Sequence, residues 1–221
     1  MNPESLIFDI DGTLWDSRAL VAEGYNRQLK AEGKTQYCTD AETLKSLFGK
    51  IMTEIADALF PDLCGKEKYD LMARCMKTEN EYLHRNPCRI GYPEVRETLE
   101  TLAQSHRLFI VSNSQKGYPE LCTEKLGIEH LISAHLCFGD TGTSKGQTIL
   151  RLMRDQNISS AAYIGDTQGD CDAADEAGIP FIWAAYGFGK VSHYDRKLSA
   201  FRDLPELLNQ APAAGKETVN L

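Results

Sequence analysis

The second half of the chain alternates short apolar runs with segments that repeat apolar residues at helical spacing, and this alternation constrains the fold most. Apolar runs at Leu108–Val111, Ala161–Ile164 and Phe181–Trp183 predict buried strands. The segments 119–126 and 173–177, which separate these runs, predict helices. Strands that alternate with helices favour an α/β fold built on a doubly wound parallel sheet.

The segment between residues 17 and 85 differs, because its apolar residues follow helical spacing throughout. It separates a first predicted strand, Leu6–Phe8, from the alternating half of the chain. Within it, Thr39 and Glu42 have the spacing of a capping box, which marks the start of a helix. We therefore predict a core domain made of residues 1–16 and 86–221, with an all-helical domain inserted at 17–85.

The composition is that of an ordinary globular protein, with 42% hydrophobic and 25% charged residues. The formal net charge of -8 argues against general nucleic-acid binding, which needs a basic surface. The N-terminal residues MNPESLIFDIDG lack the basic and apolar regions of a signal peptide. No apolar run approaches the roughly 18 residues that span a bilayer. We expect a cytoplasmic monomer or weak homodimer that binds neither nucleic acid nor a membrane.

The cysteines and histidines give no sign of a disulfide framework or of a metal motif. The seven cysteines are scattered and include no CxxC pair, which is typical of reduced thiols in the cytoplasm. The five histidines include no HxxxH or HExxH pair. We therefore expect no histidine-based zinc site.

Polar side chains follow several predicted strands at the points where those strands end. In a doubly wound sheet, ligands bind outside the carboxyl ends of the strands. Carboxylates held close together repel each other and favour a cation between them, and oxygen ligands suit Mg²⁺. These polar residues, with a lysine at the start of a predicted helix, are Asp9, Asp11, Ser112, Asn113, Lys145, Asp166 and Asp170.

Four motifs around these residues make the sequence resemble the haloacid dehalogenase (HAD) superfamily of hydrolases. Residues 9–14, DIDGTL, match the superfamily's first motif, and Ser112 after an apolar strand matches the second. Lys145 with the following glycine matches the third, and residues 165–170, GDTQGD, match the fourth. The motifs occur in family order, and the segment 17–85 has the position of the family's helical cap. The chain looks most like the phosphoglycolate-phosphatase-like group.

The resemblance implies a phosphatase, with a role for each catalytic residue. Asp9 is expected to attack phosphorus and form an aspartyl phosphate. Asp11 is expected to act as general acid for the leaving alcohol and then as general base for water. Ser112, Asn113 and Lys145 are expected to hold the phosphoryl oxygens.

The resemblance also implies a Mg²⁺ cofactor. The ion is expected to bind Asp9, Asp166 and the backbone carbonyl of Asp11. Asp170 is expected either to bind the ion through water or to orient Lys145.

The residues of the first motif distinguish among the reactions of the superfamily. Asp11 favours phosphoester chemistry over dehalogenation, because a halide leaving group needs no acid. Phosphonatases resemble the pattern DxAGT, which Ile10–Asp11 does not match. A phosphoglucomutase-type mutase shares the DxDG core and the helical cap, so it is the first alternative. A receiver-like phosphoacceptor or a non-catalytic binding protein is the second, although receivers have only about 120 residues and no helical insertion.

The expected substrate is a small phosphorylated metabolite, with phosphoglycolate-like esters as one possibility. The resemblance places the specificity loop near Phe48–Gly49, where Lys50 offers a cation for an anionic substrate group. A surface lysine is usually only solvated, so a substrate-binding role and a purely solvated one both stay open for Lys50.

Overall fold

The computed structural model describes residues 3–210 and 217–218, and the chain divides into two compact units. The sheet unit comprises residues 1–16 and 91–221, and the helical unit comprises residues 17–90. The second boundary lies at residue 91, whereas the sequence placed it at 86. The last helix of the helical unit ends at Arg85, and the backbone N–H of Asn86 caps it by donating to the Tyr82 carbonyl.

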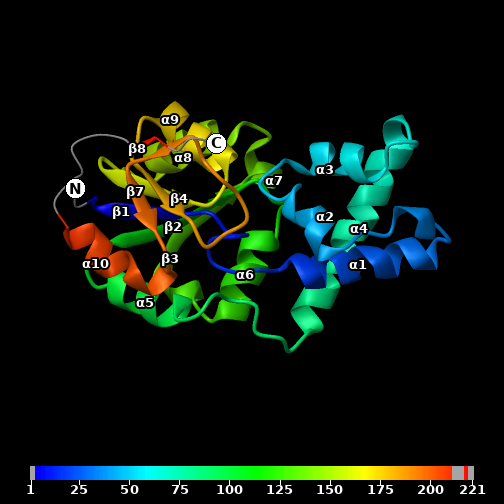
Figure 1. Cartoon of the computed structure of the whole chain (residues 1–221), viewed down its shortest axis with the longest axis horizontal. Coiled ribbons are helices and arrows are strands. Elements are labelled where there is room, and N and C mark those ends of the chain that lie inside the picture. The colour runs from blue at the N-terminus through cyan, green and yellow to red at the C-terminus, as the bar shows by residue number, and fades with distance from the viewer. Residues whose placement is uncertain (1–2, 211–216, 219–221) are drawn as a thin grey trace. The chain divides into compact units, whose positions relative to one another are not determined.

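A six-stranded parallel sheet forms the centre of the sheet unit and confirms the predicted fold class (Figure 1). The spatial order is β3-β2-β1-β4-β5-β7. The order reverses beside β1, where a doubly wound sheet opens a crevice for ligands. The strands are β1 (Ser5–Phe8), β2 (Arg107–Ser112), β3 (Ile132–Cys137), β4 (Ala161–Gly165), β5 (Phe181–Ala184) and β7 (Arg196–Leu198).

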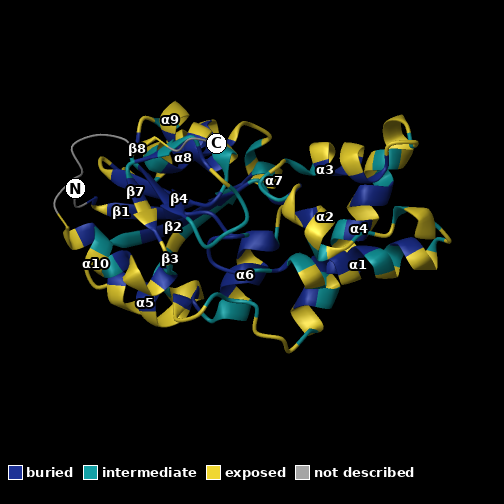
Figure 2. Ribbon diagram, in the orientation of Figure 1, coloured by how far each residue is buried: buried dark blue, intermediate teal, exposed yellow. Residues whose placement is uncertain are grey.

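Helices cover both faces of this sheet. Figure 1 shows α8 (Lys145–Asp155) and α9 (Gln168–Ala177) above it, and α5 (Val95–Leu102) and α10 (Leu204–Asn209) below it. The central strands β1, β2, β4 and β5 are almost wholly buried between these layers, whereas β3 at the edge of the sheet is mostly half-buried (Figure 2). The core between the sheet and the upper helices includes Ile7, Phe109, Ile149, Tyr163 and Phe181. Further elements are α6 (Tyr118–Leu126), η2 (Glu129–Leu131), α7 (Phe138–Thr141), η3 (Phe201–Asp203) and a two-stranded antiparallel pair, β6 (His193–Tyr194) with β8 (Glu217–Thr218).

The helical unit, residues 17–90, contains helices and turns only. Its elements are α1 (Arg18–Ala31), η1 (Thr35–Tyr37), α2 (Ala41–Lys45), α3 (Met52–Leu59) and α4 (Gly65–Arg85). Gly24 lets α1 and α4 cross closely, because a Cβ there would lie 2.7 Å from the Cα of Glu79. The guanidinium of Arg74 on α4 also bonds both carboxylate oxygens of Glu32 after α1.

The predicted capping box at Thr39 and Glu42 is wrong. Asp40 is the N-cap of α2, and its carboxylate accepts a hydrogen bond of 2.8 Å from the backbone N–H of Thr43. Aspartate is as good an N-cap as serine and better than threonine, so the adjacent residue takes the position. Among the described residues, no helix is both long and apolar enough to cross a membrane.

Candidate active site

The register of the sheet brings the predicted site residues to one edge. Phe8, the last residue of β1, pairs with Ile110 of β2 and with Ile164 of β4. The residues that follow these positions therefore emerge side by side at the carboxyl ends of the three central strands. The sequence predicted this arrangement, because parallel strands share the direction in which they end. Asp9, Asp11, Ser112 and Asp166 lie in these three strand ends or just beyond them.

Lys145 joins two of the carboxylates. Its ammonium lies 2.9 Å from Oδ1 of Asp9 and 2.6 Å from Oδ1 of Asp170. All three side chains are buried. Lys145 is the first residue of α8, and Ser144 caps that helix by accepting a hydrogen bond from the backbone N–H of Gln147. The start of the helix therefore fixes the direction from which the ammonium enters the site.

The protonation of these groups follows from burial and from their mutual charges. Burial raises the pKa of Asp9 to about 7, against the opposing pull of the Lys145 ammonium. For Asp170, burial also disfavours the charge, but Lys145 outweighs it and holds the pKa below its ordinary value. Burial disfavours the Lys145 ammonium too, yet the two carboxylates raise its pKa above the usual lysine value. In the resulting state, Lys145 is charged and bonds both an ionised Asp170 and a more basic Asp9.

Asp166 is enclosed by glycine-bearing backbone. A Cβ on Gly12, whose φ is +83°, would lie 2.2 Å from Oδ2 of Asp166, and a Cβ on Gly187 would lie 2.4 Å from its Cβ. The backbone N–H of Phe188 donates to Oδ2 at 2.6 Å, whereas Oδ1 is buried and has no hydrogen-bond partner among the described residues. Burial and the neighbouring carboxylates raise the pKa of Asp166 well above its ordinary value. An orphaned, buried carboxylate oxygen of this kind fits a metal ligand.

The carboxylates of Asp9, Asp166 and Asp170 form a cluster that suits a hard cation. One oxygen from each lies within 4.8 Å of the others. Asp170, however, is already engaged, since it accepts hydrogen bonds from Lys145 and from the backbone and hydroxyl of Thr167. The oxygens of Asp9 and Asp166 are therefore better placed than those of Asp170 to bind an ion directly, and oxygen donors suit Mg²⁺.

Asp11 points to a different set of partners. Its Oδ1 accepts a hydrogen bond of 2.8 Å from the indole N–H of Trp15 and one of 3.0 Å from the hydroxyl of Tyr118. The two rings themselves meet edge to face, with centroids 5.5 Å apart. Two donors on one oxygen fix the orientation of the carboxylate.

The remaining predicted residues divide between the two units. Ser112 ends β2 and is 5% exposed, and its Oγ accepts from the backbone N–H of Ser114 at 3.2 Å. Asn113 follows it and is half-buried. Lys50 belongs to the helical unit, where it is exposed in the turn between α2 and α3.

Several residues that support the site carried no signal in the sequence. Trp15 and Tyr118 lie 103 positions apart and meet only through the fold. Phe188 lies in the loop after β5, and its backbone N–H donates to the Asp166 carboxylate. For Thr167 the sequence does hold a partial signal, because Thr167 and Asp170 have the spacing of a capping box. The structure shows that box.

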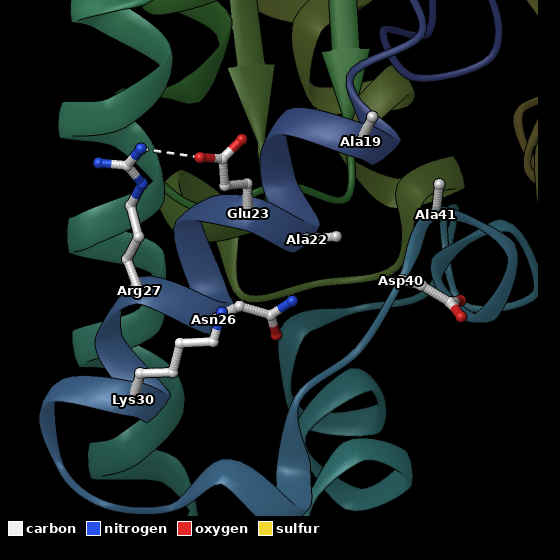
Figure 3. A pocket seen from close by; sticks show the side chains of 8 residues that line it. All are labelled: Ala19, Ala22, Glu23, Asn26, Arg27, Lys30, Asp40 and Ala41. Atoms are coloured by element: carbon white, nitrogen blue, oxygen red, sulfur yellow. Dashed lines mark hydrogen bonds and ion pairs between the residues drawn. The ribbon is translucent and has the colours of Figure 1, made fainter.

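The helical unit has a pocket of its own, with a volume of about 520 Å³ (Figure 3). Its lining comes from α1 and from Asp40–Ala41. Figure 3 shows Arg27 directed at Glu23, to which it donates a hydrogen bond of 2.7 Å. None of the residues predicted for the active site lines this pocket.

Comparison with known proteins agrees with this geometry. Residues 6–184 match the family described as haloacid dehalogenase-like hydrolase. The phosphoglycolate phosphatase of Aquifex aeolicus (strain VF5) is 28% identical over 211 residues, which cover 92% of this chain and 96% of the relative. The phosphoglycolate phosphatase of Colwellia psychrerythraea is 28% identical over 205 residues, with coverages of 84% and 85%.

Solved structures share the fold over almost the whole chain. A crystal structure from Haemophilus somnus 129PT, described as a predicted phosphoglycolate phosphatase, has a TM-score of 0.78 at 23% identity and covers 93% of this chain and 98% of its own. A HAD-superfamily hydrolase of subfamily IA from Geobacter sulfurreducens has a TM-score of 0.67 at 19% identity, with coverages of 94% and 97%. Since the family match spans most of the sequence and includes all four motifs, the chain belongs to the haloacid dehalogenase-like hydrolases.

Proposed function

We propose that this protein is a Mg²⁺-dependent phosphatase that hydrolyses small phosphate monoesters through an aspartyl phosphate on Asp9. The observation that carries the proposal is the buried contact of Lys145 with Asp9, beside the unpartnered Oδ1 of Asp166. The nucleophile Asp9, the cation of Lys145 and the unpartnered metal-ligand oxygen of Asp166 then lie at the same edge of the sheet. The names of the curated relatives support the same reaction class.

Asp9 acts as the nucleophile in the first step. One of its carboxylate oxygens bonds to phosphorus while the bond from phosphorus to the ester oxygen breaks. Asp11 gives its proton to the departing alkoxide. Lys145, with Ser112 and Asn113, offsets the charge on the phosphoryl oxygens.

Water completes the second step. Asp11, now ionised, takes a proton from the water that attacks phosphorus, so the acyl-phosphate bond breaks and inorganic phosphate leaves. Asp9 is restored as a carboxylate and Asp11 as an acid. Trp15 and Tyr118 keep the Asp11 carboxylate in one orientation during both proton transfers.

Asp9, Asp166 and the backbone carbonyl of Asp11 would hold the magnesium ion, and Asp170 would orient Lys145. When bound, Mg²⁺ supplies positive charge that offsets the charge on the transferring phosphoryl group. The orphaned Oδ1 of Asp166 and the oxygen-only donor set fit this ion.

The decisive experiment is phosphate release from p-nitrophenyl phosphate and from a panel of small phosphate monoesters, with Mg²⁺ and after exhaustive chelation. Turnover that needs Mg²⁺ and that ranks phosphoglycolate-like esters first by kcat/KM supports the proposal. Full turnover after chelation contradicts the metal requirement. Product that is an isomeric phosphosugar, with no free phosphate, supports the mutase alternative instead.

We further propose that residues 17–90 act as the cap that sets substrate choice, with Lys50 binding an anionic group of the substrate. Lys50→Ala should then lower kcat/KM for phosphoglycolate by about tenfold, a loss of ~1.4 kcal/mol, and leave p-nitrophenyl phosphate nearly unchanged. Lys77→Ala, an exposed lysine on α4, is the matched control. Equal effects of Lys50→Ala on both substrates would assign the lysine to the solvated surface.

We also propose a cytoplasmic monomer or weak homodimer. Among the described residues, the only large apolar side chains that are exposed are Tyr69 and Leu150, and they lie in different units. An extensive subunit interface usually needs a larger exposed apolar patch. Light scattering coupled to size-exclusion chromatography gives the mass, and a stable tetramer or larger species would contradict this proposal.

A further inference from the structure

A second cluster of metal-ligating side chains lies outside the active site. Cys171 and Asp175 are one helical turn apart on α9, and His193 faces them from β6. The Cys171 Sγ lies 3.4 Å from Nε2 of His193, and that nitrogen lies 2.8 Å from Oδ2 of Asp175. The three ligand atoms all lie within 4.8 Å of one another.

The histidine ring is held in the orientation that such a site needs. The hydroxyl of Ser192 lies 3.0 Å from Nδ1 of His193, while the backbone N–H of Ser192 donates to the side chain of Gln168 at the start of α9. With Ser192 beside Nδ1, the Nε2 atom faces the other two side chains, so it can bind an ion in the tautomer that carries its proton on Nδ1. Metal-binding histidines are commonly oriented by a partner at the second ring nitrogen in this way.

We propose that Cys171, Asp175 and His193 bind a Zn²⁺-type transition-metal ion, separate from the magnesium site. A thiolate, an imidazole and a carboxylate are the three ligand types that Zn²⁺ takes in proteins. With ordinary zinc–ligand bond lengths, tetrahedral geometry separates S from N by about 3.6 Å and N from O by about 3.4 Å. The observed 3.4 Å and 2.8 Å therefore need only small side-chain adjustments.

The donor set and the burial together distinguish this site from other uses of the same side chains. Cys171 is fully buried, so its sulfur is out of reach of an organic substrate, which argues against a cysteine nucleophile. Asp175 is exposed, and an ion can enter from its side. On binding, the Cys171 thiol loses its proton to solvent, and the Nε2 proton of His193 is exchanged through solvent for one on Nδ1. The thiolate, Nε2 and the Asp175 carboxylate then bond to the ion, while water takes the fourth position. The ion then joins α9, whose first turn carries Asp170, to β6.

Cobalt(II) provides the test, because it occupies zinc sites and gives an intense charge-transfer absorption only when a thiolate is bound. The intact protein is first saturated with Mg²⁺, which fills the oxygen-only cluster, and Co²⁺ is then titrated in. We expect one equivalent to bind with the thiolate absorption and to be displaced by Zn²⁺. Cys171→Ser should abolish the absorption, and His193→Gln should weaken binding by at least about tenfold.

One further site variant and two control variants make the result specific. Asp175→Asn changes an exposed side chain, so it tests the site without disturbing the core, and we expect at least about tenfold weaker Co²⁺ binding. Cys122→Ser removes a different buried thiol, and Cys38→Ser an exposed one. Both should keep the absorption. A wild-type protein without thiolate absorption, or an absorption that survives in Cys171→Ser or is unaffected in Asp175→Asn, would overturn the proposal.

Discussion

The Nζ atom of Lys145 lies 2.9 Å from Oδ1 of Asp9, and only 4% of either side chain is exposed. The two residues are 136 positions apart, so the contact joins the first strand to the start of α8. Because a buried charge is costly when it is unpaired, the pair is a requirement of the fold as well as of the chemistry.

Lys145→Met should therefore affect stability and activity together. In Mg²⁺-free buffer we expect the free energy of unfolding to fall by about 3 kcal/mol, because two buried carboxylates lose their cation. Added Mg²⁺ should recover part of the stability but not the turnover. Denaturant unfolding with and without Mg²⁺ measures this, with Lys77→Met as the control for loss of an exposed charge. An unchanged unfolding midpoint in both buffers would show that the pair contributes nothing.

Gly12→Ala tests the packing around Asp166. The residue has a φ of +83°, and the added Cβ would lie 2.2 Å from Oδ2 of Asp166. We expect a loss of stability of about 1–3 kcal/mol and a large loss of activity, because the metal-ligand carboxylate must move. Gly178→Ala is a matched control, since its φ is +69° and its Cβ would meet no atom within 4 Å. If both variants keep full activity, close packing of Gly12 on Asp166 is not needed for catalysis.

Tyr118→Phe tests the positioning of Asp11. The change removes one hydrogen bond to Oδ1 of Asp11 and keeps the aromatic ring beside Trp15. We expect kcat to fall about fivefold for alkyl phosphates, equivalent to roughly 1 kcal/mol. The fall should be smaller for p-nitrophenyl phosphate, whose leaving group needs little protonation. Tyr69→Phe, in the helical unit, should change neither rate. A uniform fall for both substrates would contradict a role that acts through the general acid.

Glu32 provides a pH-dependent contribution to stability. Its hydrogen bonds with Arg74, and then with Gln28, lower its pKa from 4.5 to about 2. The lowered pKa means that the contribution is complete above about pH 4.5 and is lost as the pH falls toward 2. Glu32→Gln should cost up to about 1 kcal/mol at pH 7, because the pair is partly exposed, and the difference from wild type should vanish near pH 2. Unfolding curves from pH 7 to 2 measure this, with Glu81→Gln as control. A stability difference between wild type and Glu32→Gln that grows on acidification would contradict the prediction.

The sheet and the residues at its edge could be predicted from the sequence because they depend on local patterns. Apolar runs identify strands, and parallel strands place their following residues at a common edge, which is how Asp9 and Asp166 come together. β7 was not predicted, since its residues Arg196–Leu198 include two charged ones and it lies at the edge of the sheet. Its strand character comes from pairing with β5 rather than from its own composition.

Contacts between distant segments could not be predicted. Tyr118, at the start of α6, approaches Asp11, which follows β1, only in the folded sheet unit, and no spacing in the sequence encodes that contact. His193 lies 22 positions from Cys171, outside any short metal-binding motif. For the same reason, the histidine patterns predicted no zinc site where the fold assembles a cysteine, a histidine and an aspartate.

Phosphate release by Asp9→Asn, beside wild type and in saturating Mg²⁺, tests the central claim most directly. The amide is a poor nucleophile and a poor metal ligand, while its size keeps the packing beside Lys145. The account predicts that kcat for p-nitrophenyl phosphate and for phosphoglycolate falls by at least about 10³-fold, with circular dichroism unchanged. Wild-type turnover by the purified variant would contradict covalent catalysis by Asp9.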